Sequence, residues 1–538
     1  MRQPPPPFVW LLICLLAGLL LTAGGRLAPQ DEETTYRMTA NLIEYGRWTI
    51  TEQTITRERQ TYPGFLPAVA PQETLTVWAV PGQDGQLYPQ FAPGQALIAI
   101  PLYLIGRLIG GAPSLSAVLI TRFTTSLFNP IIIALTGWLL ALFAARLNFS
   151  TRLSLAVGLT YALGSMALPY TRTYFGEPLI ALTITLAAYA LYRVKAAQAE
   201  RADRVEVNRW LLISGSALAI AIFTRERSAI MVPAFVLYAA PIMRRDWRRW
   251  LRWLLPMLVV GGLIGLMNWL RYGSPLTFGF SVLQHTTFST PLLLGLYGLL
   301  LSPGKGLLFY NPIAWAGLIG LGAMWRRWRA EAALFGLICV AEIGFFAVYE
   351  FWTGGWNWGP RYILPLVPLL ILAAGAWVQS KPTRLRKTAV GALMAIGLAV
   401  NVSAVPVDHS RYLIDFGERD PAQYLNRSIL NLADSPLTQQ WPTVLALADL
   451  YTQPGTWTAA REAVTAHLGA YPGGGDLETI STHLMVVDEF FRLNVPDVWL
   501  VHGLLLGYSP VLIALLGACL LAAAVVSGWQ VVRLWRAG

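Results

Sequence analysis

The sequence predicts an all-α protein that crosses a membrane about twelve times. Hydrophobic residues make up 55% of its 538 residues and charged residues only 13%, whereas a soluble domain carries about 25% charged residues. Apolar runs of about 18 residues recur along the chain, and such a run can cross the hydrocarbon of a bilayer as a helix. Because irregular backbone cannot face lipid, these runs are expected to be helical.

The apolar runs place twelve membrane-spanning helices. They are expected near residues 8–25, 116–145, 153–170, 178–194, 210–224, 228–243, 251–270, 306–325, 331–350, 362–378, 388–406 and 505–527. A further apolar segment, 94–109, contains Pro101 and Arg107, so we expect it to lie in the outer interface. The alternative is that this segment also crosses, with 116–145 divided at Asn129-Pro130.

The basic residues lie mainly in short loops between these spans. Clusters of Arg and Lys occur at 193–209, 244–252, 326–329, 381–387 and 533–536. Such loops mark the cytoplasmic side of a membrane protein. With twelve crossings, both termini are then expected in the cytoplasm. The membrane is expected to be the plasma (inner) membrane. The net charge of +11 therefore does not indicate binding to nucleic acid.

The start of the chain and its cysteines add two further expectations. Arg2, an apolar run and small residues at 23–25 would also suit a cleaved signal peptide. We expect a retained helix instead, because the later spans need its crossing. The three cysteines, Cys14, Cys339 and Cys519, lie in apolar runs, which argues against a disulfide framework or a Cys-based metal site.

Two long polar segments are predicted on the outer side. The first is the loop 26–93. The second, 407–503, contains twelve Asp or Glu and five Arg, a net charge of −7. Strings in it such as WPTVLALADLY have helical spacing, so we expect a small α-rich outer domain followed by a last span within 504–538.

Three consecutive acidic residues follow the first predicted span. Asp31, Glu32 and Glu33 would lie at the membrane surface, where a carboxylate can serve as a general base toward a lipid-borne substrate. An ordinary Asp has a pKa near about 3.9 and is a weak base, so neighbouring groups or partial burial must strengthen it. The alternative is that these are only solvated residues at a helix boundary.

Several strings then resemble one family of membrane enzymes. The acidic group is followed by a helix that ends in TANLIEYGRW. After it come YPQFAPGQALIAIPLYLIG, TYFGEPLIALTITLAAYAL, YGSPLTFGF, LLSPGKGLLFYNP and WNWGPRYILPLVP. In this order they resemble the polytopic glycosyltransferases of the C-type fold, which include the protein O-mannosyltransferases (glycosyltransferase family 39) and the aminoarabinose transferases of lipid A. The resemblance covers residues 1–406, and 407–503 matches nothing that we can name.

The resemblance implies an activity and a first set of site residues. Its members transfer a sugar from a polyprenyl-phosphate carrier to an acceptor, with inversion. Asp31 matches their first acidic position, which makes it the expected general base, with Glu32 as second choice. Glu177 matches the acidic residue of their second outer loop, where many members have Asp. Its expected role is to orient the acceptor or, with Asp31, to hold a divalent metal, which some members use. The alternative is that Glu177 merely ends the loop.

The leaving phosphate of such a donor needs cations at the depth of the interface. Arginine suits this role because its planar fork binds phosphate through two hydrogen bonds. We expect Arg122, Lys305 and Arg361 to bind it; Arg225 and Arg227 are further outer candidates. For Arg122 the alternative is a side chain that only reaches the headgroups, and for Lys305 it is a plain turn. The five histidines show no metal-binding spacing.

Other interpretations remain open from the sequence. Trp352, Trp356 and Trp358 would either stack on a sugar or lie in the membrane interface, where tryptophan is common. The acceptor would be a lipid, a glycan or a protein, and no single spacing encodes which one, nor which sugar is moved. Rival functions are a lipid or sugar transporter or flippase, an oligosaccharide polymerase or ligase, and an inactive relative that binds a partner.

Overall fold

The computed structural model describes residues 6–28, 30–51, 54–55, 65–66, 75–112, 114–201, 203–244, 246–283, 287–471 and 473–537. Within these ranges the protein is helical almost throughout. Its strands are two short antiparallel pairs, β1 (Thr54–Ile55) with β2 (Leu75–Thr76) and β3 (Ala79–Pro81) with β4 (Leu87–Pro89). The prediction of an all-α polytopic membrane protein is confirmed.

Nine helical segments of the described residues are long and apolar enough to cross a membrane. They are α5 (Leu115–Ser126) with α6 (Phe128–Arg146), α8 (Glu177–Ala199), α9 (Arg204–Thr224), η2 (Glu226–Met231) with α10 (Val232–Met243), α11 (Trp247–Tyr272), α16 (Arg329–Val348), η3 (Arg361–Leu366) with α17 (Val367–Ser380), α18 (Arg384–Val402) and α25 (Pro510–Ala537). Each of them coincides with a predicted span.

The remaining three predicted spans contain shorter helices than expected. These are α1 (Pro6–Leu21), α7 (Thr151–Leu163) and α15 (Ile313–Arg327). At about 1.5 Å per residue, α7 is only about 20 Å long. It packs against α6 and α17, while α1 packs against α6 and α25. Non-helical backbone at membrane depth is tolerated where protein surrounds it, and η1 (Pro169–Arg172), which follows α7, is fully buried.

The segment 94–109 does not form a helix long enough to span a membrane. It contains α3 (Gly94–Ile98) and α4 (Ile100–Gly110), whose 11 residues extend about 16 Å. Leu104, Ile105 and Leu108 of α4 are exposed, as expected of a helix in the interface. The helix is interrupted only at Leu127, between α5 and α6. Asn129 and Pro130 lie inside α6, and 115–146 together form one candidate span, so the division expected in the alternative interpretation is not found.

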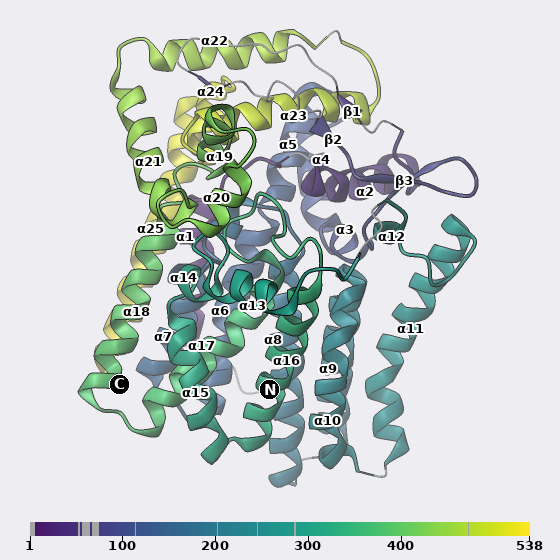
Figure 1. Ribbon diagram of the computed structural model, residues 1–538, viewed down its shortest axis with the longest axis vertical. Helices are drawn as coiled ribbons and strands as arrows, with labels where there is room; N and C mark the ends of the chain where they lie inside the picture. Colours follow the sequence, from purple (N-terminus) through teal and green to yellow (C-terminus); the bar gives the residue numbers. More distant parts are fainter. Residues whose placement is uncertain are drawn as a thin grey trace.

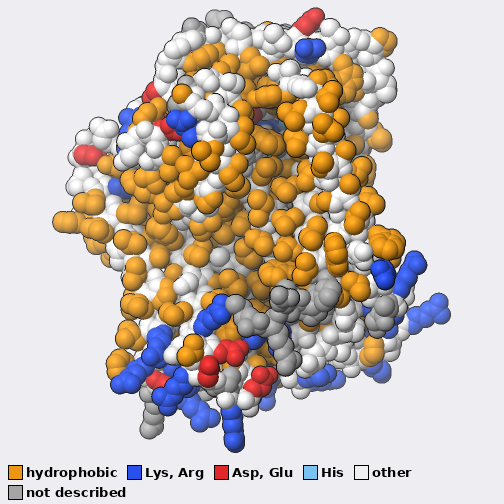
Figure 2. All heavy atoms as spheres, turned by 180° about the vertical axis from the view of Figure 1, so that it is seen from behind, with side chains coloured by type: hydrophobic (Ala, Val, Ile, Leu, Met, Phe, Trp, Pro, Cys, Tyr) orange, Lys and Arg blue, Asp and Glu red, His pale blue; other side chains and the backbone are white. Residues whose placement is uncertain are grey.

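The basic and apolar side chains lie in separate zones of the surface. Figure 2 shows Lys and Arg gathered at the lower end, below a broad apolar belt. Figure 1 places the N- and C-termini in the lower part of the molecule and α22 (Thr456–Gly469) and α23 (Leu477–Asn494) at the opposite end. One end of the helical bundle is therefore basic, and the segment 410–505 covers the other, which we call the outer end.

Short helices build this outer end. They are α2 (Asp31–Tyr45), α12 (Gly279–Leu283), α19 (Ser410–Arg419), α20 (Tyr424–Leu430), α21 (Pro436–Thr452) and α24 (Trp499–Leu505). Two further short helices, α13 (Leu292–Leu301) and α14 (Leu307–Tyr310), lie nearer the middle of the molecule (Figure 1). The helix α2 is buried along most of its length although its sequence is polar. Its Tyr36 and Ala40 belong to the same apolar cluster as Val487 and Phe490 of α23. Packing against the 407–503 segment thus fixes α2.

Candidate functional site

The first turn of α2 places Asp31 against an arginine from a distant loop. Arg361, the first residue of η3, donates its Nη1 to Asp31 Oδ2 at 2.8 Å. The Asp31 side chain keeps 17% of its surface exposed, so the carboxylate can still meet a substrate. The predicted base and one predicted phosphate ligand are therefore in direct contact.

Glu177 joins the same group of side chains. It begins α8, where the next residue, Pro178, suits the first helical turn because it lacks an N–H. Glu177 is fully buried; its Oε1 accepts a hydrogen bond from Arg227 Nη2 at 2.7 Å and lies 3.6 Å from Arg361 Nε. We call the set Asp31, Glu177, Arg225, Arg227 and Arg361 the charged centre.

Aromatic rings hold the guanidinium groups of the charged centre in position. Arg361 lies between Phe175, at 4.5 Å, and Tyr362, at 5.1 Å. Arg225 lies over Phe91 at 3.9 Å. Such cation–π contacts strengthen as water is excluded, and Arg225 and Arg361 are both at least nine-tenths buried. The charged centre is thus preorganised.

The charged centre does not suit a divalent metal ion. Arg361 contacts both Asp31 and Glu177, so it occupies the place where a cation shared by these two carboxylates would bind. Among the residues that the structure describes, no group of three His, Cys, Asp or Glu is arranged to hold a metal. The metal alternative of the sequence analysis therefore finds no support in this arrangement.

Lys305 lies close to the charged centre but has partners of its own. Its Nζ donates to the backbone oxygens of Gly355, at 2.8 Å, and Asn357, at 2.5 Å. The side chain is buried, and this burial, together with the nearby Arg361, lowers the pKa of Lys305 to about 7. Lys305 braces the loop before Arg361, and its charge at neutral pH is only partial.

A cavity of about 500 Å³, open solvent at its mouth included, lies next to the charged centre. We call it the outer cavity. Phe175, the ring under Arg361, forms part of its wall. Its other polar and aromatic lining residues are Arg26, Glu32, Tyr170, Arg172, Thr173, Trp356, Asn357, Trp358, Asp408, His409 and Arg492. Five segments far apart in the sequence therefore meet there.

Glu32 faces the outer cavity, whereas its neighbour Asp31 faces the charged centre. Glu32 is 1% exposed, and its Oε2 accepts a hydrogen bond from the Ala28 amide at 2.8 Å. Burial raises the pKa of this carboxyl to about 8 in spite of that amide, the nearby Arg26 and the backbone amide of Tyr174. Its Oε1 has no hydrogen-bond partner of normal geometry among the described residues. Near neutral pH Glu32 is thus mainly a neutral hydrogen-bonding group.

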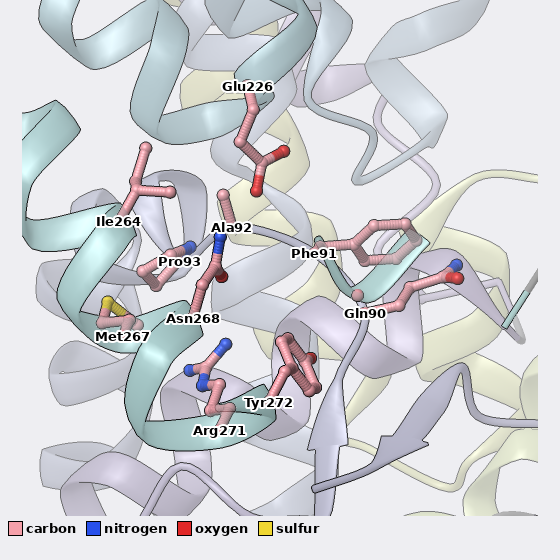
Figure 3. A pocket seen from close by; sticks show the side chains of 11 residues that line it. Gln90, Phe91, Ala92, Pro93, Glu226, Ile264, Met267, Asn268, Arg271 and Tyr272 are labelled. Atoms are coloured by element: carbon pink, nitrogen blue, oxygen red, sulfur yellow. The ribbon is translucent and has the colours of Figure 1, made fainter. Parts of the chain in front are cut away.

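A second cavity lies beside α11 (Figure 3) and measures about 270 Å³, open solvent at its mouth included. We call it the α11 pocket. Ile264, Asn268 and Arg271 line it from one face of α11, at helical spacings of three and four. On the neighbouring face, Leu263 and Leu270 are exposed, as expected of a lipid-facing surface. Phe91, the ring under Arg225, connects this pocket to the charged centre.

Arg271 is the most notable side chain of the α11 pocket. It is 6% exposed, and its Nη2 makes no hydrogen bond of normal geometry to any described group. The Tyr272 hydroxyl and Gln90 Oε1 are also buried without such a partner. Arg271 also lies over the Tyr88 ring at 5.2 Å and interacts with Tyr272, and the Glu226 side chain lines the same pocket. Its remaining N–H group suits an anionic ligand such as a phosphate. Sequence reasoning missed Arg271 because it ends a predicted span, where an interfacial arginine is common.

Arg122, unlike Arg361, pairs with carboxylates of α2 and α23 that are not part of the charged centre. Its Nη1 lies 2.5 Å from Glu33 Oε2, and its Nη2 lies 2.5 Å from Asp488 Oδ2 in α23; its Nη1 also donates to Ser481 at 2.6 Å. Burial opposes the charge of Glu33, but Arg122 and Arg37 hold its pKa below the ordinary value. Arg122 thus joins α5, α2 and α23, and its role as a phosphate ligand remains a prediction.

The three tryptophans of the 351–361 loop differ in exposure. Trp352 and Trp358 are buried, at 8% and 4% exposed. Trp358 donates its Nε1 to Asn401 at 2.9 Å. Trp356 is only partly buried; it lies 6.0 Å from the Tyr424 ring and lines the outer cavity. Trp356 is therefore the one of the three with ring surface left to meet a ligand.

Comparison with solved structures finds similar proteins at low identity. ArnT from Cupriavidus metallidurans bound to undecaprenyl phosphate is 15% identical, with a TM-score of 0.44, over 93% of this chain and 77% of that one. The apo state of ArnT gives 16% identity and a TM-score of 0.45, over 90% and 75%. The archaeal oligosaccharyltransferase AglB from Archaeoglobus fulgidus, in complex with an inhibitory peptide and a dolichol-phosphate, gives 12% and 0.28, over 98% and 55%. No protein-family model and no curated protein matches the chain.

Proposed function

We propose that this protein is an inverting membrane glycosyltransferase, which moves a sugar from a polyprenyl-phosphate carrier to an acceptor hydroxyl at the outer end. The observation that carries the proposal is the contact of Asp31 and Glu177 with Arg361. It joins a partly exposed carboxylate to a cluster of guanidinium groups, between a pocket beside a lipid-facing helix and an outer cavity. In this proposal residues 1–406 form the transferase module and 407–503 an outer domain.

Asp31 is the general base of the proposed reaction. As the acceptor oxygen forms its bond to the anomeric carbon, its proton passes to the Asp31 carboxylate. The bond between the anomeric carbon and the phosphate oxygen breaks, and its electron pair leaves with the carrier phosphate. The phosphate is a stable anion, so no group has to protonate it. Attack from the opposite side inverts the configuration at the anomeric carbon.

The α11 pocket is the best-supported place for the carrier phosphate. Arg271 offers a free N–H group there, and Arg225 lies on the far side of Phe91. A lipid chain attached to this phosphate could leave along the exposed side of α11. The alternative from the sequence, binding by Lys305 and Arg361, is less direct because Lys305 is bonded to backbone carbonyls.

Glu177 acts as a positioning residue in this proposal. It is fully buried and is contacted by Arg227 and Arg361. Its charge balances these two guanidinium groups, and one of them, Arg361, in turn fixes the orientation of Asp31. This arrangement leaves Glu177 less able than Asp31 to touch an acceptor.

The direct test is transfer by the purified protein in liposomes. Polyprenyl-phosphate sugars labelled in the sugar are supplied together with a lipid and glycan extract as acceptor. The expected result is release of free polyprenyl phosphate together with a labelled product. Movement of the intact donor across the bilayer, without cleavage, would instead support the flippase alternative.

A further inference from the structure

The outer cavity has a more varied lining than proton abstraction by Asp31 requires. Its walls combine aromatic rings, among them Trp356 and Tyr170, with several charged side chains. The chemistry of its lining therefore indicates what kind of group it accepts.

The charges that line the outer cavity are already compensated. Arg26 forms a two-pronged pair with Asp497, through hydrogen bonds of 2.9 and 2.7 Å. Arg492 pairs with Glu489 and lies 3.7 Å from Asp408. The third arginine, Arg172, donates to backbone oxygens of Val405 and Thr22 and to the Thr171 hydroxyl. With each guanidinium engaged, the cavity does not call for an anionic ligand.

The unsatisfied groups of the cavity are neutral hydrogen-bonding groups. Glu32 Oε1 and His409 Nε2 are buried without a hydrogen-bond partner of normal geometry among the described residues. Burial lowers the pKa of His409 to about 4 even though Asp408 lies beside it, so the imidazole is neutral at pH 7. Both side chains are at least nine-tenths buried. Leaving such groups unpaired is costly, and a ligand that bonds them would offset this cost.

A sugar ring offers what these walls lack. Its C–H face packs on an aromatic ring, such as the partly buried Trp356, and its hydroxyls both donate and accept hydrogen bonds. We infer that the outer cavity binds a neutral saccharide ring that belongs to the acceptor, so that the acceptor is a glycan or glycoside. The acceptor assignment rests on the proposed function; the class of ligand rests on the cavity alone.

The position of the outer cavity indicates that the sugar bound there belongs to the acceptor and not to the donor. Asp31 and Glu32 are adjacent on α2 but face the charged centre and the outer cavity, respectively. The α11 pocket is connected to the charged centre through Phe91, and the outer cavity through Phe175. If the carrier phosphate binds in the α11 pocket, in-line attack requires the acceptor to approach through the other connection.

Ligand-observed NMR on the protein in nanodiscs tests this inference without any need for turnover. The probes are methyl glycosides of glucose, galactose, mannose and N-acetylglucosamine, and a neutral Ser/Thr peptide as competitor, each at millimolar concentration. At least one glycoside is expected to bind, and the signal should fall to background in Trp356→Ala. The matched control is Trp441→Ala, at an exposed tryptophan of α21, which should bind as the unaltered protein does. Glu32→Met fills similar space without hydrogen-bonding atoms and serves as a second variant.

The outcomes separate the inference from the proposed function. Binding of the peptide but no glycoside, or glycoside binding that survives in both Trp356→Ala and Glu32→Met, would overturn the saccharide site. In transfer assays we expect Trp356→Ala to raise the acceptor KM about tenfold or more, equivalent to about 1.4 kcal/mol, with the donor KM unchanged. A change in the donor KM alone would overturn the acceptor assignment. Glycoside binding that depends on Trp356, in a protein that cleaves no polyprenyl-phosphate sugar, would support the saccharide site and contradict the proposed function.

Discussion

Arg361 donates a hydrogen bond of 2.8 Å to Asp31 although 330 positions of sequence separate them. The contact brings the start of α2 to the start of η3 at the outer end of the helical bundle. It fixes a carboxylate beside three guanidinium groups in a partly shielded setting, where ionic hydrogen bonds are stronger than in water. The proposed chemistry depends on this contact.

The orientation of the protein in the membrane follows from its basic end. We expect the termini and the loop 244–252 in the cytoplasm and 407–503 outside. Single cysteines introduced into 407–503 should react with an impermeant thiol reagent in intact cells, and cysteines in 244–252 should react only after lysis. The opposite pattern would place the charged centre in the cytoplasm and contradict the proposed site.

Arg271 should govern the use of the lipid donor. Because its guanidinium is buried with a free N–H group, Arg271→Ala should raise the donor KM about tenfold to a hundredfold, as expected for a lost hydrogen bond to a charged group. Lys305→Ala tests the alternative site, and Arg384→Ala, at an exposed arginine of the basic end, is the control. A donor KM that changes with Lys305 and not with Arg271 would move the phosphate to the site expected from the sequence.

Arg122 should affect stability before it affects donor binding. Removing one member of a buried ion pair costs about 3–5 kcal/mol, and Arg122 is bonded to both Glu33 and Asp488. We expect Arg122→Ala and Asp488→Asn both to lower the Tm in detergent. Arg107→Ala breaks a more exposed pair with Glu44 and should cost about 0–1 kcal/mol. A stable Arg122→Ala protein with weakened donor binding would restore Arg122 as a phosphate ligand.

Glu32 should make the stability depend on pH in a defined window. Its pKa is about 8 in the folded protein against 4.5 for the ordinary carboxyl. The folded state therefore holds a proton that the unfolded state releases, and stability falls as the pH rises from about 4.5 to 8. Glu32→Gln cannot titrate, so this loss of stability with rising pH should be absent from the variant. The Tm of Glu32→Gln minus the Tm of the unaltered protein should therefore increase as the pH rises through this window. A Tm difference that stays constant with pH would show that Glu32 is not held neutral.

The sequence predicted the helices because an apolar run of sufficient length forms a membrane-spanning helix from its own residues. Runs such as 251–270 and 331–350 coincide with α11 and α16, whereas 153–170 predicted a longer helix than α7. There the backbone turns into η1 within the bundle, and only tertiary packing can satisfy such a turn. Periodicity alone does not reveal where a helix stops inside protein.

The site was predicted only in part, because local strings identify candidate residues but do not reveal contacts between distant segments. Asp31, Glu177 and Arg361 were singled out from separate strings, and the structure brings them together. Arg122 was singled out as a costly buried charge, but its partner Asp488 lies 366 positions later, beyond any local pattern. Arg271 could have been noticed as a charge at the outer end of a predicted span. That its Nη2 is buried without a hydrogen bond of normal geometry to any described group is visible only in three dimensions.

The central claim is that Asp31 abstracts the proton of the acceptor hydroxyl during transfer from a polyprenyl-phosphate sugar. Asp31→Asn keeps the shape of the side chain and removes its basicity. The measurement is the single-turnover rate of transfer by purified protein saturated with labelled donor, with the anomeric configuration of the product determined. We expect a rate lower by about 10²–10⁴ in a protein that remains folded at the assay temperature, and an inverted product from the unaltered protein. A rate within about tenfold of the unaltered protein, or a product of retained configuration, would contradict it.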